Sequence, residues 1–235
     1  MSDITLANEQ MDTLHQKKTQ DFWRKGSWLR WIVHLLGVWP LAALGWDAWQ
    51  GNLSVNPIQD AEQRLGRAAL YFLVASLAVT PLTTLTGWHF LPPRRRALGL
   101  YAFLYASLHF AVFVALDYGF DIPEIFRLTR EKPFILLGLT AGLLLLPLAI
   151  TSFDHLMRRM GKRWKRLHRL IYLIAPMVIL HYAWAQKGDF FALRGDILRP
   201  LLWGIVLIVL FVLRLPVVRR KLSAMRQKVS SVKSV

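Results

Sequence analysis

Cysteine is absent from this chain of 235 residues. Without thiols the protein cannot form disulfides, thiolate zinc sites or iron–sulfur clusters, and it cannot attach a c-type haem covalently. Any bound metal must therefore be held by histidine, carboxylate or methionine side chains. The seven histidines of the chain are the first candidates for such ligands.

Acidic residues are scarce, with 14 Asp and Glu against 30 Lys and Arg, which gives a net charge of +16. In a soluble protein this excess would suggest a nucleic acid as the partner. No basic soluble domain is visible here, and the basic residues instead flank long apolar blocks, where they set the orientation of membrane spans. We therefore expect no nucleic-acid partner.

The apolar residues, 54% of the chain, occur in long blocks separated by short charged segments. This pattern predicts an all-α integral membrane protein rather than a soluble domain, whose apolar residues would recur with helical or strand period. Ten tryptophans and six tyrosines suit the aromatic belts of membrane interfaces. We expect a bundle of six transmembrane helices, over residues 31–49, 67–84, 97–116, 134–153, 167–185 and 200–218.

These spans divide the chain into a flexible arm (residues 1–27), a six-helix transmembrane domain (28–218) and a basic tail that we expect to be disordered (219–235). Six spans place both termini on one side of the membrane. That side carries 22 of the Lys and Arg residues and the opposite side carries eight. The positive-inside rule therefore predicts that both termini, and with them the arm and the tail, are cytoplasmic.

Two histidines lie at matched depth within separate spans. His109 is 12 residues beyond the start of the third span and His181 is 14 residues beyond the start of the fifth, so both lie about 18–21 Å into the membrane, towards its outer half. A histidine inside a membrane is costly without a partner, and two at one depth can clamp a haem from its two faces. The alternative is that each histidine makes a hydrogen bond to a neighbouring helix.

His168 lies at the cytoplasmic end of the fifth span, about 20 Å along the helix from His181. That offset suits a second redox cofactor. The matching position on the third span is Arg96, which cannot donate a lone pair to iron. His168 is therefore expected to bind a haem with a different partner ligand, to contact a flavin, or to cap the interface.

Arg67 lies at the outer end of the second span. Its guanidinium group could pair there with a haem propionate. The alternative is an ordinary interfacial arginine, whose charged head lies in water.

Three segments of the chain resemble the haem-binding membrane subunit of the bacterial protein-methionine-sulfoxide reductase system, the MsrQ or YedZ family within the ferric-reductase-like transmembrane group. They are GRAALYFLVASLAVTPL (66–82), RRALGLYAFLYASLHF (95–110) and GKRWKRLHRLIYLIAPMVILHYAW (161–184). The resemblance implies one or two b-type haems with His109, His168 and His181 as ligands. It also implies an FMN, for which the sequence offers no assigned residues.

The same resemblance implies a location in the bacterial inner membrane and a role as a non-catalytic electron-transfer subunit. Such a subunit passes electrons to a periplasmic molybdopterin-containing subunit, which reduces methionine sulfoxide in oxidised envelope proteins. The electrons would come from a cytoplasmic flavin reductase or from membrane quinol.

Two other functions stay open. A free-standing ferric reductase generally needs a cytoplasmic flavin and nicotinamide domain, and the chain has neither that domain nor a glycine-rich dinucleotide loop. A non-redox transporter could use intramembrane histidines as proton relays.

Overall fold

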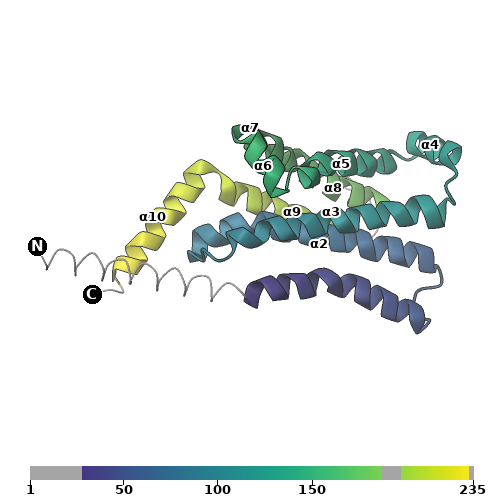
Figure 1. Ribbon diagram of the computed structural model, residues 1–235, viewed down its shortest axis with the longest axis horizontal. Coiled ribbons are helices and arrows are strands. Elements are labelled where there is room, and N and C mark those ends of the chain that lie inside the picture. The colour runs from purple at the N-terminus through teal and green to yellow at the C-terminus, as the bar shows by residue number, and fades with distance from the viewer. Residues whose placement is uncertain (1–27, 187–196, 233–235) are drawn as a thin grey trace, which may run out of the picture.

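The structure is a computed structural model that describes residues 28–186 and 197–232, with side chains described as far as residue 226. All regular structure in these ranges is helical (Figure 1). The expected arm, residues 1–27, and most of the expected loop 186–199 lie outside the described residues. The elements run in the order Trp28–Trp49, α2 (Pro57–Thr86), η1 (Pro92–Arg94), α3 (Arg95–Val112), η2 (Phe113–Asp117), α4 (Ile122–Glu131), α5 (Pro133–Ile150), α6 (Asp154–Met160), α7 (Lys162–Leu167), η3 (His168–Leu170), α8 (Ile171–Ala185), α9 (Leu198–Arg214) and α10 (Pro216–Val232).

The predicted multi-pass membrane architecture is confirmed. Within the described part of the chain, five helices are long and apolar enough to cross a membrane, and α9 with α10 makes a sixth if this bent pair is counted as one span. The longest helix, α2, starts at the cap formed by Asn56, whose side chain accepts a hydrogen bond from the Gln59 amide. It ends at Gly87, which adopts the left-handed conformation (φ 75°) that glycine tolerates best. The cytoplasmic placement of the termini stays a prediction.

Several expected boundaries were wrong. The second span was expected from residue 67, but α2 begins at Pro57 and takes in much of the expected polar link. The loops expected at 117–133 and 154–166 contain α4, α6 and α7. The span expected to reach residue 218 ends at Arg214, and α10 forms a helix over most of the tail that we expected to be disordered.

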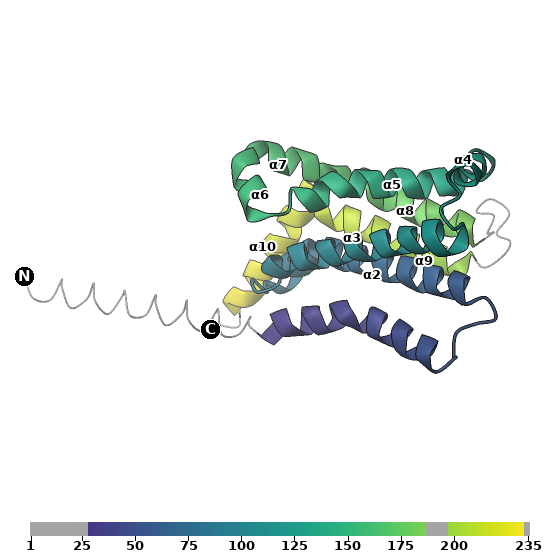
Figure 2. The same ribbon diagram turned by 45° about the vertical axis from the view of Figure 1, so that its right-hand side comes forward.

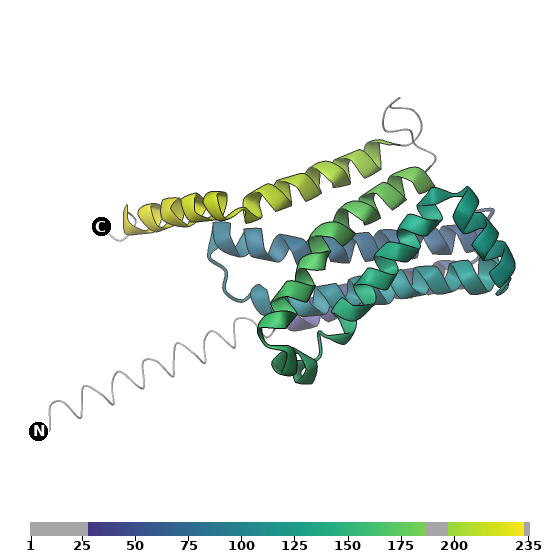
Figure 3. The ribbon, with the colours of Figure 1, turned by 90° about the horizontal axis from the view of Figure 1, so that it is seen from above.

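Two helix pairs form the body of the bundle. The helices α2 and α3 pack together along their length, and α5 packs on α8, which also contacts α9 (Figures 2 and 3). The main core lies between α2, α3, α8 and α9, and a second cluster, built on Ala141, Leu145, Leu148 and Ile174, joins α5 to α8.

The first helix, Trp28–Trp49, is held against α3 by polar contacts. The hydroxyl of Tyr105, which is fully buried, donates to the Gly37 carbonyl at 2.6 Å, and Tyr101 forms a hydrogen bond of 2.9 Å with His34 Nδ1. A Cβ at Gly37 would lie 2.2 Å from the Tyr101 ring, so this close approach requires glycine. The ring of His34 is therefore hydrogen-bonded to a neighbouring helix.

The bundle has two chemically different ends. At one end lie the start of α3, the end of α9 and most of the arginines; we call it the basic end. At the other lie the start of α2, the end of α3 and α4; we call it the histidine end. Figure 1 shows α6 and α7 at the basic end of α5, and α4 at its histidine end.

Candidate functional site

A cavity of about 370 Å³ opens at the histidine end, between α2, α3, α4, α5 and α8. We call it the histidine cavity. Its walls are mostly apolar and include side chains such as Leu70, Phe110, Ile135, Leu139 and Val178. Cavities of this size, with a few polar groups on apolar walls, are typical ligand sites. The polar groups here include both intramembrane histidines of the prediction, His109 and His181.

His109 reaches the cavity from the last turn of α3. Its Nδ1 lies 2.9 Å from the Glu62 carbonyl oxygen on α2. A carbonyl can only accept a hydrogen bond, so Nδ1 carries the ring proton and Nε2 keeps its lone pair. The ring packs on Gly66, where a Cβ would lie 3.2 Å from Nδ1. The α2 backbone therefore fixes both the tautomer and the position of His109.

His181 reaches the same cavity from α8 in an equivalent way. Its Nδ1 donates to the Phe134 carbonyl on α5 at 2.7 Å, which again leaves Nε2 with a free lone pair. It packs even more closely on glycine, because a Cβ at Gly138 would lie only 2.6 Å from Cε1.

The two histidine supports repeat in sequence as well as in space. In each case the accepting carbonyl lies 47 residues before the histidine. In each case the glycine under the ring follows that carbonyl by one helical turn, as Gly66 follows Glu62 and Gly138 follows Phe134. The pairs α2–α3 and α5–α8 thus present two equivalent imidazoles to one cavity.

The rings lie side by side, as their matched depth predicts, with centroids 6.1 Å apart and planes at 76°. Two imidazoles that bind one transition metal through Nε2, at about 2.0–2.1 Å from the metal, would have ring centres roughly 6 Å apart. Neutral imidazoles with Nδ1 bonded to a backbone carbonyl are also the usual metal-ligating form. The residues present therefore fit an iron held between the two histidines, inside a cavity whose apolar walls suit a porphyrin.

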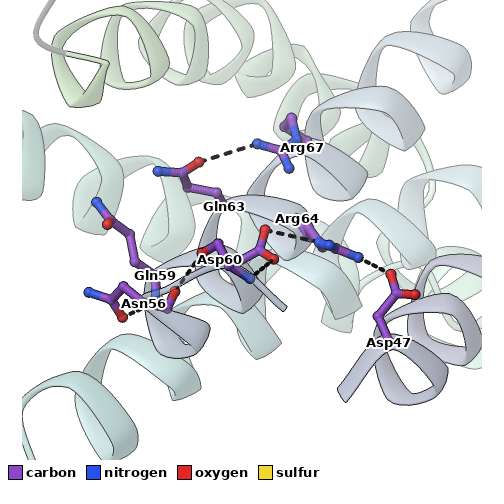
Figure 4. A network of polar contacts seen from close by, with 8 residues as sticks. Asp47, Asn56, Gln59, Asp60, Gln63, Arg64 and Arg67 are labelled. Carbon is purple, nitrogen blue, oxygen red and sulfur yellow. Dashed lines mark hydrogen bonds and ion pairs between the residues drawn. The ribbon is translucent and has the colours of Figure 1, made fainter. Parts of the chain in front are cut away.

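Two ionisable residues of α2 also line the cavity. Glu62 Oε1 lies 4.0 Å from His109 Nε2. The Arg67 guanidinium makes one long contact, 3.4 Å, to the Gln63 side-chain oxygen. Its neighbour Arg64 is held much more firmly, since it donates to Asp60 at 2.9 Å and forms an ion pair with Asp47 of the first helix (Figure 4). Of these two arginines, Arg67 is the one on the cavity wall.

The helix α4 contributes Ile125 and Thr129 to the wall of the cavity at the histidine end. Its cap is the Asp121 side chain, which accepts from the Glu124 amide at 3.0 Å. On its outward face Arg127 donates to Glu124 and lowers the pKa of that carboxyl, so this face stays ionised. The helix thus has one face in the cavity wall and a charged face outside it.

His168 does not line the histidine cavity. It belongs to the short helical turn η3 at the basic end, where its Nδ1 donates to the Trp164 carbonyl at 3.2 Å and its ring lies 4.0 Å from the Trp164 ring. The matching residue of α3, Arg96, forms an ion pair with Asp154. The structure therefore brings His109, His181 and Arg67 together and leaves His168 apart.

Five features of the site were not predicted from the sequence: the backbone carbonyls of Glu62 and Phe134, the two supporting glycines, and α4. The carbonyls have no side-chain signal. The helix α4 could have been found, because Asp121, Pro123 and Glu124 form a helix start signal ahead of apolar residues spaced three apart.

Comparison with known proteins places the chain beside redox membrane subunits. A family model described as "Ferric reductase like transmembrane component" matches residues 65–179. This range contains His109, Phe134 and the two glycines under the rings, but it does not contain Glu62 or His181.

Curated relatives named "Protein-methionine-sulfoxide reductase heme-binding subunit MsrQ" match most of the chain. The relative from Xanthomonas euvesicatoria pv. vesicatoria is 43% identical over 201 residues, which cover 83% of this chain and 88% of that protein. The relative from Herminiimonas arsenicoxydans is 40% identical over 184 residues, which cover 78% of this chain and 82% of that protein.

Proposed function

Because the chain belongs to the MsrQ family of haem-binding subunits of the protein-methionine-sulfoxide reductase system, we propose that it carries electrons through a b-type haem held between His109 and His181. The observation that carries this proposal is the pair of imidazoles, 6.1 Å apart, each with Nδ1 bonded to a backbone carbonyl. Haem, when bound, supplies one-electron iron chemistry.

The residues of this chain position the two imidazoles and set the polarity around them. The carbonyls of Glu62 and Phe134 hold each Nε2 ready as an electron-pair donor and increase its basicity. The glycines under the rings fix the rings in place. The mostly apolar walls lower the polarity around the site, which tunes the potential of a bound iron.

Arg67 is proposed to pair with a haem propionate. It lies on the cavity wall near the end of the bundle, it interacts with Asp60 only through charge, and its hydrogen bond to Gln63 is long at 3.4 Å, so its guanidinium donors are available to an acidic partner. The alternative, an interfacial arginine in water, predicts that its removal has no effect on haem binding.

The electron acceptor is proposed to be a periplasmic molybdopterin-containing subunit that reduces methionine sulfoxide, with this chain in the bacterial inner membrane. The cavity lies at the end of the bundle opposite the basic end, and the positive-inside rule puts that end on the outer face. Electrons would enter at the basic end, from a cytoplasmic flavin reductase or from membrane quinol. FMN is proposed as a further cofactor, and His168 as a contact to a second cofactor at that end.

The alternative within the same chemistry is a ferric-reductase-like cytochrome with another acceptor, which the family match at residues 65–179 supports equally well. Reduction of chelated iron by the isolated subunit would favour it. A transporter with histidine relays would instead show pH-dependent solute uptake in vesicles and no haem.

The test is the absorbance spectrum of protein purified from haem-replete cells. We expect a b-type haem in the wild type and its loss in His109→Ala and His181→Ala. His34→Ala is the matched control, because His34 is also intramembrane but bonds to Tyr101 outside the cavity. Restoration of the spectrum in His109→Gly by added imidazole would show that the variant is folded. A colourless wild type would contradict the proposal.

A further inference from the structure

A second cavity, of about 480 Å³, lies at the basic end where α9 gives way to α10. The two helices meet at 74°. Leu215 has an extended backbone (ψ 136°), as expected for a residue before proline, and Pro216 begins the next helix. The sequence Leu-Pro thus specifies the bend, and the bend forms the pocket. Figure 1 shows α10 turning away from the line of α9 at this point.

The lining of this bend pocket is strongly basic. It consists of Arg214, Pro216, Arg219, Arg220, Ser223 and Ala224. In the part of the chain whose side chains are described, no ion pair includes any of these three arginines. The described carboxylate at this end, Asp154, is paired with Arg96. Among the residues whose side chains are described, no carboxylate is therefore paired with the three guanidinium groups that line this pocket.

Arg214 is held rigidly in the wall of the pocket. It donates through Nη2 to the Leu77 carbonyl at 2.5 Å and through Nη1 to the Tyr172 hydroxyl at 3.3 Å, and its guanidinium lies 5.8 Å from the centre of the Tyr172 ring. Its Nε is buried and has no hydrogen-bond partner. A buried donor without a partner is costly, and such groups in native structures often mark a missing ion or ligand.

We infer that the bend pocket binds a phosphate group. Guanidinium groups recognise phosphate oxygens in a bidentate manner, and the Ser223 hydroxyl supplies one more donor. Arg214 supplies a fixed charge between α2 and α8, while Arg219 and Arg220 lie at the end of the first turn and the start of the second turn of α10, near the positive end of its dipole. The site is independent of the haem proposal, since it lies at the opposite end of the bundle.

Two sources of phosphate fit the location. One is the headgroup of an anionic phospholipid, because α10 is basic and exposes Val217 and Met225, as interfacial helices do. The other is the phosphate of a mononucleotide cofactor such as FMN. Tyr172 follows His168 by one helical turn, so a nucleotide anchored at Arg214 would lie close to His168.

The experiment compares each phosphate probe with a counterpart that lacks the anionic group. Binding of FMN and of riboflavin is measured by flavin fluorescence, and retention of phosphatidylglycerol and of phosphatidylcholine by native mass spectrometry. The variants are Arg219→Gln/Arg220→Gln and, as a control of similar position and charge type, Lys221→Gln, whose side chain does not line the pocket. Arg214 is left intact because its contacts to α2 and α8 support the fold.

We expect the double variant to weaken binding of one phosphate probe at least tenfold, and Lys221→Gln to change it less than twofold. An effect on FMN but not on riboflavin identifies a nucleotide site, and an effect on phosphatidylglycerol alone identifies a lipid site. The inference is overturned if neither phosphate probe binds better than its counterpart, or if the double variant binds both as the wild type does. An unchanged size-exclusion profile and an unchanged thermal unfolding temperature in detergent show that the rest of the bundle is intact in each variant.

Discussion

The two ends of this protein hold histidines in different ways. At the histidine end, His109 and His181 are each bonded to the carbonyl of a different helix and pressed against a glycine, so that Nε2 of each is free beside a shared cavity. At the basic end, His168 donates to the Trp164 carbonyl one turn earlier at 3.2 Å, its ring lies beside the Trp164 ring, and it also interacts with the Leu148 backbone of α5. The two histidines that share the cavity are thus positioned by the backbone of a neighbouring helix, whereas His168 is positioned in part by the turn that precedes it.

The position of α3 that matches His168 is occupied by a residue that cannot bind iron. The α3 residue at the matching position is Arg96, and its charge is taken up by Asp154 at the start of α6. The basic end is thus arranged around guanidinium groups, and the histidine end around neutral imidazoles. This difference predicts that the two ends respond differently to the same kinds of substitution.

The largest expected effect comes from comparing His181→Ala with His168→Ala. We expect His181→Ala to lose the haem at the histidine end completely, because one of two axial ligands is gone. His168→Ala should keep the low-spin spectrum of that haem, and any loss of cofactor should be confined to a second haem or a flavin. Haem and flavin are quantified per mole of protein in each variant. Complete loss of haem in His168→Ala would show that the two ends do not act separately.

The next effect distinguishes the two glycine supports. A methyl group at Gly138 would lie 2.6 Å from the His181 ring and must push it off the Phe134 carbonyl, whereas one at Gly66 would lie 3.2 Å from the His109 ring. We therefore expect Gly138→Ala to retain well under half of the haem and Gly66→Ala to lose less.

Gly45→Ala is the control for this pair, because a Cβ at Gly45 meets nothing within 4 Å. It should bind haem as the wild type does. The measurement is the haem-to-protein ratio after purification, with size-exclusion chromatography to show that each variant is folded. Equal retention in Gly138→Ala and Gly45→Ala would contradict the role of the close packing under His181.

The helical class was predictable from hydropathy, and the matched depth of His109 and His181 was predictable from the fixed rise of a helix, in agreement with rings whose centroids lie 6.1 Å apart. The sequence could not predict what holds the rings, because a backbone carbonyl such as that of Phe134 leaves no mark in the side-chain pattern. The 47-residue repeat becomes visible only after the contacts are known. The prediction that the tail is disordered was wrong, because it gave more weight to the high charge of the tail than to the helical spacing of its apolar residues.

A smaller effect is expected from the two arginines of α2. If Arg67 pairs with a propionate, Arg67→Gln removes a charge-assisted hydrogen bond of about 1.5–3 kcal/mol, and haem transfer to an external acceptor protein should become roughly tenfold faster or more. Arg64→Gln is the matched comparison one turn away. Arg64 bonds to Asp47 and Asp60, so its loss should loosen the first helix and leave haem transfer nearly unchanged. Equal rates in the two variants would favour an interfacial role for Arg67.

The smallest effect tests the support of His168. The Trp164 indole donates through Nε1 to the Thr151 carbonyl at 2.9 Å, which ties the turn before His168 to the end of α5. Trp164→Phe keeps an aromatic ring beside His168 but removes this bond, so we expect a loss of about 0.5–1.5 kcal/mol in unfolding free energy. Thermal unfolding in detergent measures the change, and the haem between His109 and His181 should keep its spectrum. Since the α5 end held by Trp164 is far from Phe134 at the α5 start, a change in that spectrum would mean that α5 transmits disturbance along its whole length, and the two ends could no longer be treated as separate sites.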